Sequence, residues 1–308
     1  AMTPGPSSAW HAALKVACRR PQGVDLSSLR LCTLAAEMID AGVVDRLRVE
    51  GAELGLDPAA VHGAYGLAET TLAVAGTGVG KPLRIDEVDR TALAEAGVAT
   101  PSVSADARRI VSCGPPVPGA ELRVVAPGGD DLGDRGVGEV FVRCPSLLDG
   151  YVSEAGPIDP LEDGWLPTGD IGYLADGELY VTGRAKDIVI VMGRNYSAHD
   201  IEWAAERAAG VRVGRCVAFC REGEEGQVVI AAEVNGGDPT DVPREVWRSV
   251  SDAIGVLPRE VVVLPRGTIP LTTSGKLRRS WVRQADASGR LRALALAVGP
   301  ADTRTGTP

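Results

Sequence analysis

Helical and strand-like runs of apolar residues alternate along the first part of the chain. In the helical runs, apolar side chains recur every three or four residues, which is typical of a helix with one buried face. The strand-like runs are short and mostly apolar. The expected helices cover residues 7–20 and 40–54, and the expected strands cover residues 29–36 and 60–64. Because strands that alternate with helices favour a parallel sheet, residues 1–107 are predicted to form a partial α/β subdomain.

Residues 77–106 interrupt this pattern with glycine, charged residues and small polar residues. Such a composition is typical of connecting segments at a protein surface. We therefore expect an inserted surface segment, near residues 81–107, in the first subdomain.

Residues 108–183 are predicted to form a β-rich subdomain. Short apolar runs alternate there with Gly, Pro and Asp, which favour turns between strands. The expected strands cover residues 122–125, 138–143, 171–174 and 179–182. Short strands in close succession indicate a small β-barrel or a strongly bent sheet.

The apolar pattern changes again at residue 184, and residues 184–288 are predicted to form a compact α+β domain. The expected strands cover residues 187–192, 212–220, 227–234 and 260–264, and the expected helices cover residues 198–209 and 243–254. Pro243 near the start of the second helix and Gly255 just past its end agree with the usual preferences at helix ends. Residues 289–308 are expected to be a frayed tail.

Composition and charge argue against several classes of function. The chain has 308 residues, of which 44% are hydrophobic, so it is long enough for two domains with separate cores. The net charge of −9 argues against nucleic acid or anionic membrane as a general partner, because both bind basic surfaces. No apolar run approaches the roughly 20 residues of a membrane span, and no signal peptide is visible at the N-terminus.

The cysteines favour a reducing compartment. The six cysteines form no CxxC pair, and with only three histidines in the chain a zinc site is not expected. Free thiols are the simplest interpretation, and we therefore expect a cytoplasmic protein.

Four polar motifs follow one another in the chain. They are AYGLAET at residues 64–70, PTGD at residues 167–170, GRAKD at residues 183–187 and TSGK at residues 273–276. In this order they resemble the motifs of the adenylate-forming superfamily, which includes acyl-CoA synthetases, luciferases and peptide-synthetase adenylation domains. The pattern is most similar to that of the fatty acyl-AMP ligases. The resemblance implies a truncated adenylate-forming (ANL) fold: α/β with a small β-barrel and a C-terminal α+β lid domain.

The reaction implied by this resemblance places demands on charge. A carboxylate joins the α-phosphate of ATP and pyrophosphate leaves, so two anions must approach each other. The site has to supply positive charge and an ordered metal ion, which implies ATP or AMP and Mg²⁺ as cofactors. Because the carboxylate is itself the nucleophile, no Ser/His constellation is needed.

The first motif would contact the nucleotide and the metal. The resemblance implies that Tyr65 packs on adenine, that Glu69 binds Mg²⁺ and that Thr70 contacts phosphate, with Gly66 in the tight turn between them. Glu suits a hard cation, and Tyr supplies a flat apolar face with a polar tip. The alternative is an ordinary junction from strand to turn to helix, with Thr70 as a capping residue.

Three further residues would act near the ribose and the hinge. The resemblance implies that Asp170 accepts hydrogen bonds from both ribose hydroxyls, which one carboxylate can do. Arg184 would bind ribose or phosphate with its planar guanidinium. Lys186 would be the pivot of the hinge between the large domain and the lid. The alternatives are a Gly-Asp hairpin turn and a charged β-turn.

The Ala36-Glu37 pair is a further candidate for nucleotide contact. Similar ligases have Gly-Ala-Glu at this turn, whereas this chain has Ala35 in place of the glycine. A Cβ atom makes both a close approach and a positive φ harder. A plain strand end is the alternative.

Lys276 is the expected catalytic cation. The chain around it is not a P-loop, because Pro270 and Leu277 stand where that motif has Gly and Ser or Thr. The resemblance implies that Lys276 enters the site on a flexible loop and stabilises charge on the carboxylate and the α-phosphate. One positioned donor of this kind contributes roughly 3–4 kcal/mol. A Gly-Lys turn on the surface is the alternative.

Only the second half of the family pattern is present. The 64 residues before Tyr65 contain no Ser/Thr/Gly-rich phosphate loop. We therefore expect a truncated acyl-AMP ligase that activates a carboxylic or fatty acid for transfer to an acyl carrier protein. The exposed edge of a half-built sheet favours a separate N-terminal ligase chain or a homodimer as partner. The alternatives are a degenerate ligase that acts as a binding or scaffold protein, or an acyltransferase that uses a preformed adenylate.

Overall fold

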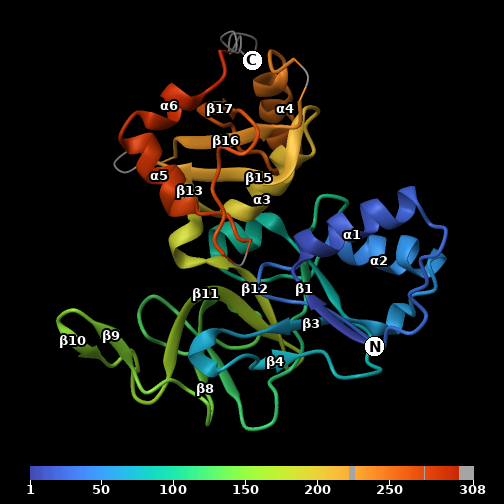
Figure 1. The fold of residues 1–308 in the computed structure, drawn as a ribbon. Coiled ribbons are helices and arrows are strands. Elements are labelled where there is room, and N and C mark those ends of the chain that lie inside the picture. Colours follow the sequence, from blue (N-terminus) through green and yellow to red (C-terminus); the bar gives the residue numbers. More distant parts are fainter. Residues whose placement is uncertain (222–225, 237, 274, 298–308) are drawn as a thin grey trace. The chain divides into compact units, whose positions relative to one another are not determined.

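The computed structural model describes residues 1–221, 226–236, 238–273 and 275–297 (Figure 1). The chain divides into two units, Ala1–Lys186 and Asp187–Pro308. Each unit has its own sheets and its own buried core. The boundary lies directly after Lys186, three residues beyond the division at residue 183 that the apolar pattern predicted.

The first unit begins with a small sheet covered by two helices. Its strands lie in the order β1-β2-β3-β4, where β1, β2 and β3 are parallel and β4 is antiparallel to β3. The strands are β1 (Met2–Gly5), β2 (Leu31–Leu34), β3 (Val61–Tyr65) and β4 (Ala75–Gly76), and the helices are α1 (Ser7–Arg19) and α2 (Ala41–Glu53). Trp10, Leu14 and Leu47 of the helices are buried against Leu34 and Val61 of the strands. The predicted helices and the strands β2 and β3 are confirmed.

Residues 77–106 contribute to a second core, although the sequence predicted a surface segment. This part contains β5 (Ile85–Val88) and one turn of π-helix, η3 (Ala92–Ala96), and β5 pairs with β6 (Arg108–Val111). Val88 is fully buried, and Tyr173 Oη donates a hydrogen bond to Asp86 Oδ2 at 2.7 Å. Arg135 Nη1 donates to the same Asp86 oxygen at 2.9 Å. The apolar residues of this segment are scattered, so their burial depends on partners far along the chain.

A four-stranded antiparallel sheet forms the middle of the first unit. Its strands are β7 (Glu121–Val125), β8 (Gly138–Arg143), β11 (Leu166–Ala175) and β12 (Glu178–Arg184), in the order β12-β11-β8-β7. On the outer side of β12, Ser112 forms an isolated bridge with Tyr180, and the Cys113 N–H donates a hydrogen bond to the Leu179 carbonyl at 2.7 Å. Register shifts interrupt β11 on both sides, and such bulges bend a strand. The sheet is therefore bent, which is one of the two predicted forms, while the small barrel stays a prediction.

Short elements connect these sheets. The 3₁₀ helices η1 (Pro58–Ala60) and η2 (Ala68–Thr70) precede and follow β3 in the chain. A hairpin of β9 (Tyr151–Ser153) and β10 (Gly156–Ile158) comes between β8 and β11 in the sequence. A last 3₁₀ turn, η4 (Ala185–Asp187), spans the boundary between the units.

The second unit is a three-stranded sheet with helices on both faces (Figure 1). Its elements are β13 (Ile188–Val191), β14 (Arg194–Ser197), α3 (Ala198–Glu206), β15 (Val211–Cys220), β16 (Val228–Val234), α4 (Val242–Ile254), β17 (Glu260–Leu264), α5 (Arg279–Ala287) and α6 (Arg290–Leu294). Alternate residues of the central strand β16 face the two cores, with Ile230 towards α3 and α4 and Ala231 towards α5 and α6. All the predicted strands and helices of this unit are confirmed, whereas β14, α5 and α6 were not predicted.

The frayed tail that the sequence predicted for residues 289–308 is wrong for its first part. Residues 290–294 form α6, in which Leu291 is fully buried, and the Leu296 N–H donates a hydrogen bond to the Val263 carbonyl at 2.8 Å. The segment is too short and too rich in Arg and Ala to give a helical period by itself. Residues 298–308 lie outside the described residues. Across the residues that the structure describes, no helix is long and apolar enough to cross a membrane.

Leu291 tests whether the last helix belongs to the core. We expect Leu291→Ala to lower the free energy of unfolding by about 2–5 kcal/mol, because it leaves a cavity in a packed core. The matched control is Leu257→Ala, at a position that is 57% exposed, and it should cost less than about 0.5 kcal/mol. Urea unfolding measures both, and equal costs would contradict the assignment of α6 to the core.

Glu206 at the end of α3 should make the second unit sensitive to pH. Burial raises the pKa of Glu206 from 4.5 to about 7, although hydrogen bonds from the backbone of Gly214 and its neighbours lower it. Because folding disfavours the charged form, the stability of the wild type should fall as the pH rises from about 4.5 to about 7. Glu206→Gln should lack this decrease, and Asp252→Asn, at an exposed position of α4, should keep it. Thermal unfolding between pH 4 and pH 8 measures the difference, and parallel profiles for wild type and Glu206→Gln would refute it.

Candidate functional site

Three of the predicted site residues meet at one carboxylate in the first unit. Tyr65 Oη donates a hydrogen bond to Asp170 Oδ2 at 2.7 Å, and Arg184 Nε donates one to Asp170 Oδ1 at 2.7 Å. Tyr65 stands at the end of β3, Asp170 within β11, and Arg184 at the end of β12. The spatial grouping of these three residues is therefore present in the structure, while their contacts with a ligand stay predictions.

A tight turn places Tyr65 at this position. The chain reverses directly after β3, and the Val74 N–H donates a hydrogen bond to the Tyr65 carbonyl at 2.9 Å. A Cβ atom on Gly66 would lie 1.6 Å from the carbonyl oxygen of Leu72. Only glycine allows so close an approach of two backbone segments. Gly66 therefore acts through the shape of the turn.

Asp170 sits at a bulge in β11. Pro167 pairs with Phe141 of β8, and Ile171 pairs with Glu139 of the same strand. Three residues of β11 therefore lie opposite one residue of β8. Such a bulge changes the direction in which the side chains of its residues point. Asp170 is only 5% exposed, so its carboxylate depends on protein donors for most of its hydrogen bonds.

The charges at this position suit hydroxyl donors. Burial raises the pKa of the Tyr65 hydroxyl well above its ordinary value, and the neighbouring Asp170 carboxylate raises it further. Tyr65 therefore stays a proton donor throughout the physiological range. Each oxygen of a carboxylate has a second lone pair, so Asp170 can still accept two hydrogen bonds from vicinal hydroxyls. The side chain of Arg184 is 48% exposed and can contact a charged ligand.

Glu69 and Thr70 have neighbours of their own. Tyr151 Oη donates a hydrogen bond to Glu69 Oε1 at 2.9 Å, and this bond raises the pKa of Tyr151. Thr70 is 1% exposed, and its hydroxyl donates to the Leu67 carbonyl at 2.9 Å. The structure therefore leaves the Glu69 carboxylate accessible but turns the Thr70 hydroxyl inwards, where it caps the turn. Contact between Thr70 and phosphate stays a prediction that needs a change of rotamer.

Glu69 is suited to hold one side of a Mg²⁺ ion. A half-buried carboxylate with one oxygen bound to a hydroxyl still presents its other oxygen, and Mg²⁺ prefers one or two such ligands together with phosphate and water. Among the described residues, no group of three or more His, Cys, Asp or Glu side chains is arranged as a metal site. Glu69 would therefore be a single protein ligand.

Glu37 has a structural contact that the sequence did not predict. Its Oε1 accepts a hydrogen bond from the Ser8 N–H at 2.7 Å, and its Oε2 accepts one from Ser8 Oγ at 3.3 Å. A carboxylate at the first turn of α1 satisfies a free N–H group and interacts favourably with the helix dipole. Ala36 adopts φ = 71° in spite of its Cβ atom, at a cost of roughly 1–2 kcal/mol. Nucleotide contact by this pair stays a prediction.

Lys186 is exposed and is the last residue of the first unit. The next residue, Asp187, is 5% exposed and accepts a hydrogen bond from Arg283 of α5 at 2.7 Å. The exposed Lys186 is therefore followed directly by Asp187, whose side chain is held by a hydrogen bond. This is a suitable position for a pivot, and the pivot itself stays a prediction.

Lys276 lies on an exposed hairpin of the second unit. Leu271 and Leu277 form an isolated bridge, and the Thr272 N–H donates a hydrogen bond to the Lys276 carbonyl at 2.8 Å. The Lys276 N–H in turn donates to Thr272 Oγ1 at 3.0 Å. These bonds make a tight turn that projects the lysine outwards. Ser274 of the motif lies outside the described residues.

Buried carboxylates anchor both ends of this hairpin. Glu233 is fully buried, and its Oε1 accepts a hydrogen bond from the Ile269 N–H at 2.7 Å, while its Oε2 accepts one from Arg212 at 2.8 Å. At the other end, Arg279 donates to the buried carboxylate of Glu202. Glu233 was not among the residues predicted from the sequence. It could have been found as the single acidic residue in the otherwise apolar run of β16, because a buried carboxylate needs hydrogen-bond donors.

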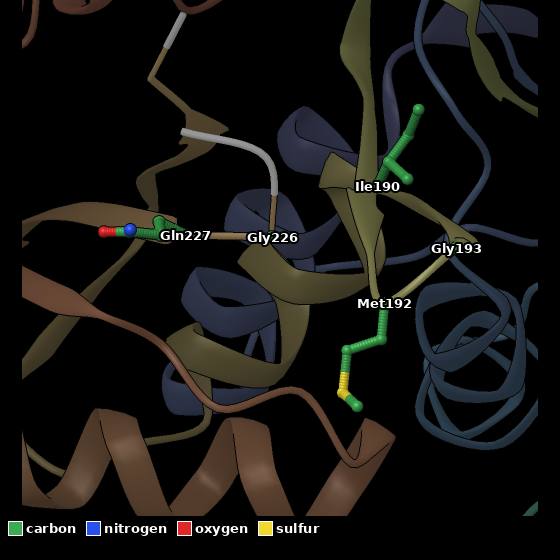
Figure 2. Close-up of a pocket in the computed structure, with 5 residues that line it drawn as sticks. All are labelled: Ile190, Met192, Gly193, Gly226 and Gln227. Atoms are coloured by element: carbon green, nitrogen blue, oxygen red, sulfur yellow. The ribbon is translucent and has the colours of Figure 1, made fainter. Parts of the chain in front are cut away.

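A pocket of about 360 Å³ lies elsewhere in the second unit (Figure 2). The described residues that line it are Ile190, Met192, Gly193, Gly226 and Gln227. Figure 2 shows Met192 at the turn that follows the strand carrying Ile190. No predicted site residue and no ionisable side chain is among these lining residues. The pocket therefore offers no general acid, base or metal ligand from the part of the chain that the structure describes.

Comparisons with known proteins find several similar sequences. The family model of AMP-binding enzymes matches residues 1–152. A putative ligase of Mycobacterium tuberculosis is 40% identical over 290 residues, which cover 91% of this chain and 53% of the relative. A medium-chain-fatty-acid–[acyl-carrier-protein] ligase of Moorena producens is 31% identical over 309 residues, which cover 93% of this chain and 52% of the relative. The chain spans about half the length of the curated relatives it matches.

A solved structure is also similar. It comes from work on fatty acyl-adenylate ligases from E. coli and L. pneumophila, and it matches with a TM-score of 0.83 at 29% sequence identity. The match covers 93% of this chain and 52% of that chain.

The two donors to Asp170 should differ in their effect on stability. Tyr65→Phe removes a buried donor from a charged acceptor and should lower the free energy of unfolding by about 1.5–3 kcal/mol. Arg184→Gln removes a half-exposed ion pair and should cost about 1 kcal/mol or less, because water screens it. Urea unfolding measures both variants. A larger cost for Arg184→Gln than for Tyr65→Phe would contradict this account of the site.

Proposed function

Because this chain belongs to the adenylate-forming superfamily of AMP-binding enzymes, close to the fatty acyl-AMP ligases, we propose that it activates a carboxylic or fatty acid as an acyl-adenylate. The observation that carries the proposal is the meeting of Tyr65 and Arg184 at the Asp170 carboxylate. These residues come from three separate motifs of the family pattern. Their convergence supports a common ligand, and a nucleoside fits the donors and acceptors present.

The proposed reaction joins the acid to AMP. A carboxylate oxygen of the acid attacks the α-phosphorus of ATP, the bond from this phosphorus to the bridging oxygen breaks, and pyrophosphate leaves with the electron pair. Negative charge increases around the α-phosphorus in the transition state, so cationic donors fixed in advance accelerate the step.

Asp170, Tyr65 and Arg184 would hold the nucleoside. Asp170 keeps one free lone pair on each oxygen and would accept the two ribose hydroxyls. The ring of Tyr65 would pack on adenine while its hydroxyl keeps the carboxylate in place. Arg184 is half exposed and would turn its free guanidinium nitrogens towards ribose or phosphate.

Glu69 and Lys276 would act on the phosphates and the acid. Glu69 would hold Mg²⁺, which supplies charge neutralisation at the phosphates when it is bound. Lys276 would donate to the developing charge on the carboxylate and the α-phosphate. Glu233 and Glu202 bind residues at the two ends of the exposed hairpin that carries Lys276. This anchoring supports a role in which the hairpin positions the lysine side chain for the reaction. We propose that rotation at Lys186 re-aims the second unit, as one pivot residue can do.

We further propose an acyl carrier protein as the acceptor of the acyl group. The relative from Moorena producens is named as a ligase for an acyl carrier protein. A binding protein that holds AMP without chemistry is the second candidate, and the inward-turned Thr70 hydroxyl is the observation that favours it.

Exchange of labelled pyrophosphate into ATP tests the proposed activity. We expect acid-dependent exchange with Mg²⁺ and a medium-chain or long-chain fatty acid. Lys276→Ala should reduce the rate by about 10²–10³, because it removes one positioned donor. The matched control is Lys81→Ala, at another exposed lysine outside the proposed site, which should leave the rate unchanged. AMP binding without exchange for any acid would favour the binding protein instead.

A further inference from the structure

We propose that Glu139 of β8 is a positioning residue that holds Asp170 in the orientation needed to accept ribose hydroxyls. The inference rests on the proposed nucleoside site and adds a residue that lies outside the four motifs. It follows from the way in which the bulge in β11 is held together. Glu139 would act through the backbone of the turn and not by contact with the nucleoside.

The bulge removes the ordinary hydrogen bonds of the sheet. The pairing between β8 and β11 stops at Phe141 and Pro167 and resumes at Glu139 and Ile171. Val140 alone therefore lies opposite the three residues Thr168–Asp170. The backbone N–H groups of these three residues therefore make no regular sheet hydrogen bonds with β8. A buried N–H group without a hydrogen-bond partner lowers the stability of the fold.

Side chains replace the missing ladder. The Gly169 N–H donates a hydrogen bond to Glu139 Oε1 at 2.9 Å, and the Asp170 N–H donates one to Thr168 Oγ1 at 3.1 Å. Thr168 Oγ1 then donates to the Val140 carbonyl at 2.7 Å. Both amides of the turn that carries Asp170 are thereby tied to β8, one by Glu139 directly and one by Thr168.

The charge and the reach of Glu139 suit this role. Gly169 adopts φ = 69°, which a glycine tolerates but does not prefer, so its own backbone does not fix the turn. A carboxylate is a stronger acceptor for an N–H group than a neutral oxygen. The Glu139 side chain starts from the strand that lies beside the bulge, in register with Ile171. It therefore limits rotation of the peptide directly before Asp170.

Rotation of this turn would mainly affect binding of the groups that Asp170 recognises. The Asp170 carboxylate is held between Tyr65 and Arg184, and a small change in its direction misaligns it for two vicinal hydroxyls. A misplacement of about 1 Å at a positioned group is enough to cost a large factor in function. The proposed contacts of Tyr65 with adenine and of Arg184 with phosphate come from side chains on β3 and β12, outside the turn that Glu139 holds, and should be affected less.

Calorimetry with two nucleotides separates positioning from general damage. In the 308-residue chain, we expect Glu139→Ala to weaken binding of AMP about tenfold and to leave binding of 2′,3′-dideoxy-AMP within about twofold of the wild type. Glu139→Gln keeps an oxygen acceptor and should restore most of the AMP affinity. Glu121→Ala is the matched control, since it removes an exposed glutamate from the neighbouring strand β7.

The outcomes separate this inference from the proposed function. Equal weakening of both nucleotides, or no weakening of AMP, would overturn the positioning role while leaving the nucleoside site intact. A wild-type chain that binds neither nucleotide would overturn the nucleoside site itself and with it this inference. Amide hydrogen exchange tests the same role without a ligand. Exchange of the Gly169 N–H should become faster in Glu139→Ala and should stay at the wild-type rate in Glu139→Gln. An unchanged rate in Glu139→Ala would refute the positioning role.

Discussion

The first unit depends on a nearly buried carboxylate that needs donors. Removing an ionised carboxylate from water costs several kcal/mol unless hydrogen bonds and opposite charge replace the water. Asp170 meets this requirement through Tyr65 on one oxygen and Arg184 on the other. The end of β3, the bulge in β11 and the end of β12 are therefore held together at one point. A ligand with two hydroxyls can use the remaining lone pairs of the same carboxylate, so the interaction that stabilises the unit also prepares the site.

The same physical device recurs in the second unit. Glu233 and Glu202 are buried acids, and each is paired with an arginine and with a backbone N–H group. Together they fix the two ends of the hairpin that carries Lys276. Glu139 holds the Asp170 turn through a backbone amide in a similar way. In both units the turns that carry the proposed chemistry are held by hydrogen bonds to acidic side chains, and none of these acids has to touch a ligand.

Much of the candidate site could be predicted from the residue motifs, and some of it could not. Tyr65, Asp170 and Arg184 were predicted to share one ligand, and the structure groups them. Thr70 and Glu37 were expected at the nucleotide, yet each is engaged with nearby backbone: Thr70 with the Leu67 carbonyl and Glu37 with the first turn of α1. A motif identifies which residue types are present. It does not tell whether a side chain faces a ligand or satisfies a backbone group, because that depends on a rotamer and on neighbours far along the chain.

The sequence by itself determined the helices whose apolar residues repeat with a clear period, such as α1, α2 and α4, and the strands that are continuous apolar runs, such as β16. It also determined the order of the motifs. Only the tertiary structure decided that the middle strands form a bent sheet, that Leu291 completes a core and that Glu139 accepts a hydrogen bond from the turn that carries Asp170. The reason is the range of the interactions. Periodicity is a local property that neighbouring residues express together, whereas the bend of a sheet, burial of an isolated leucine and the partner of a carboxylate are decided by segments that meet only after folding.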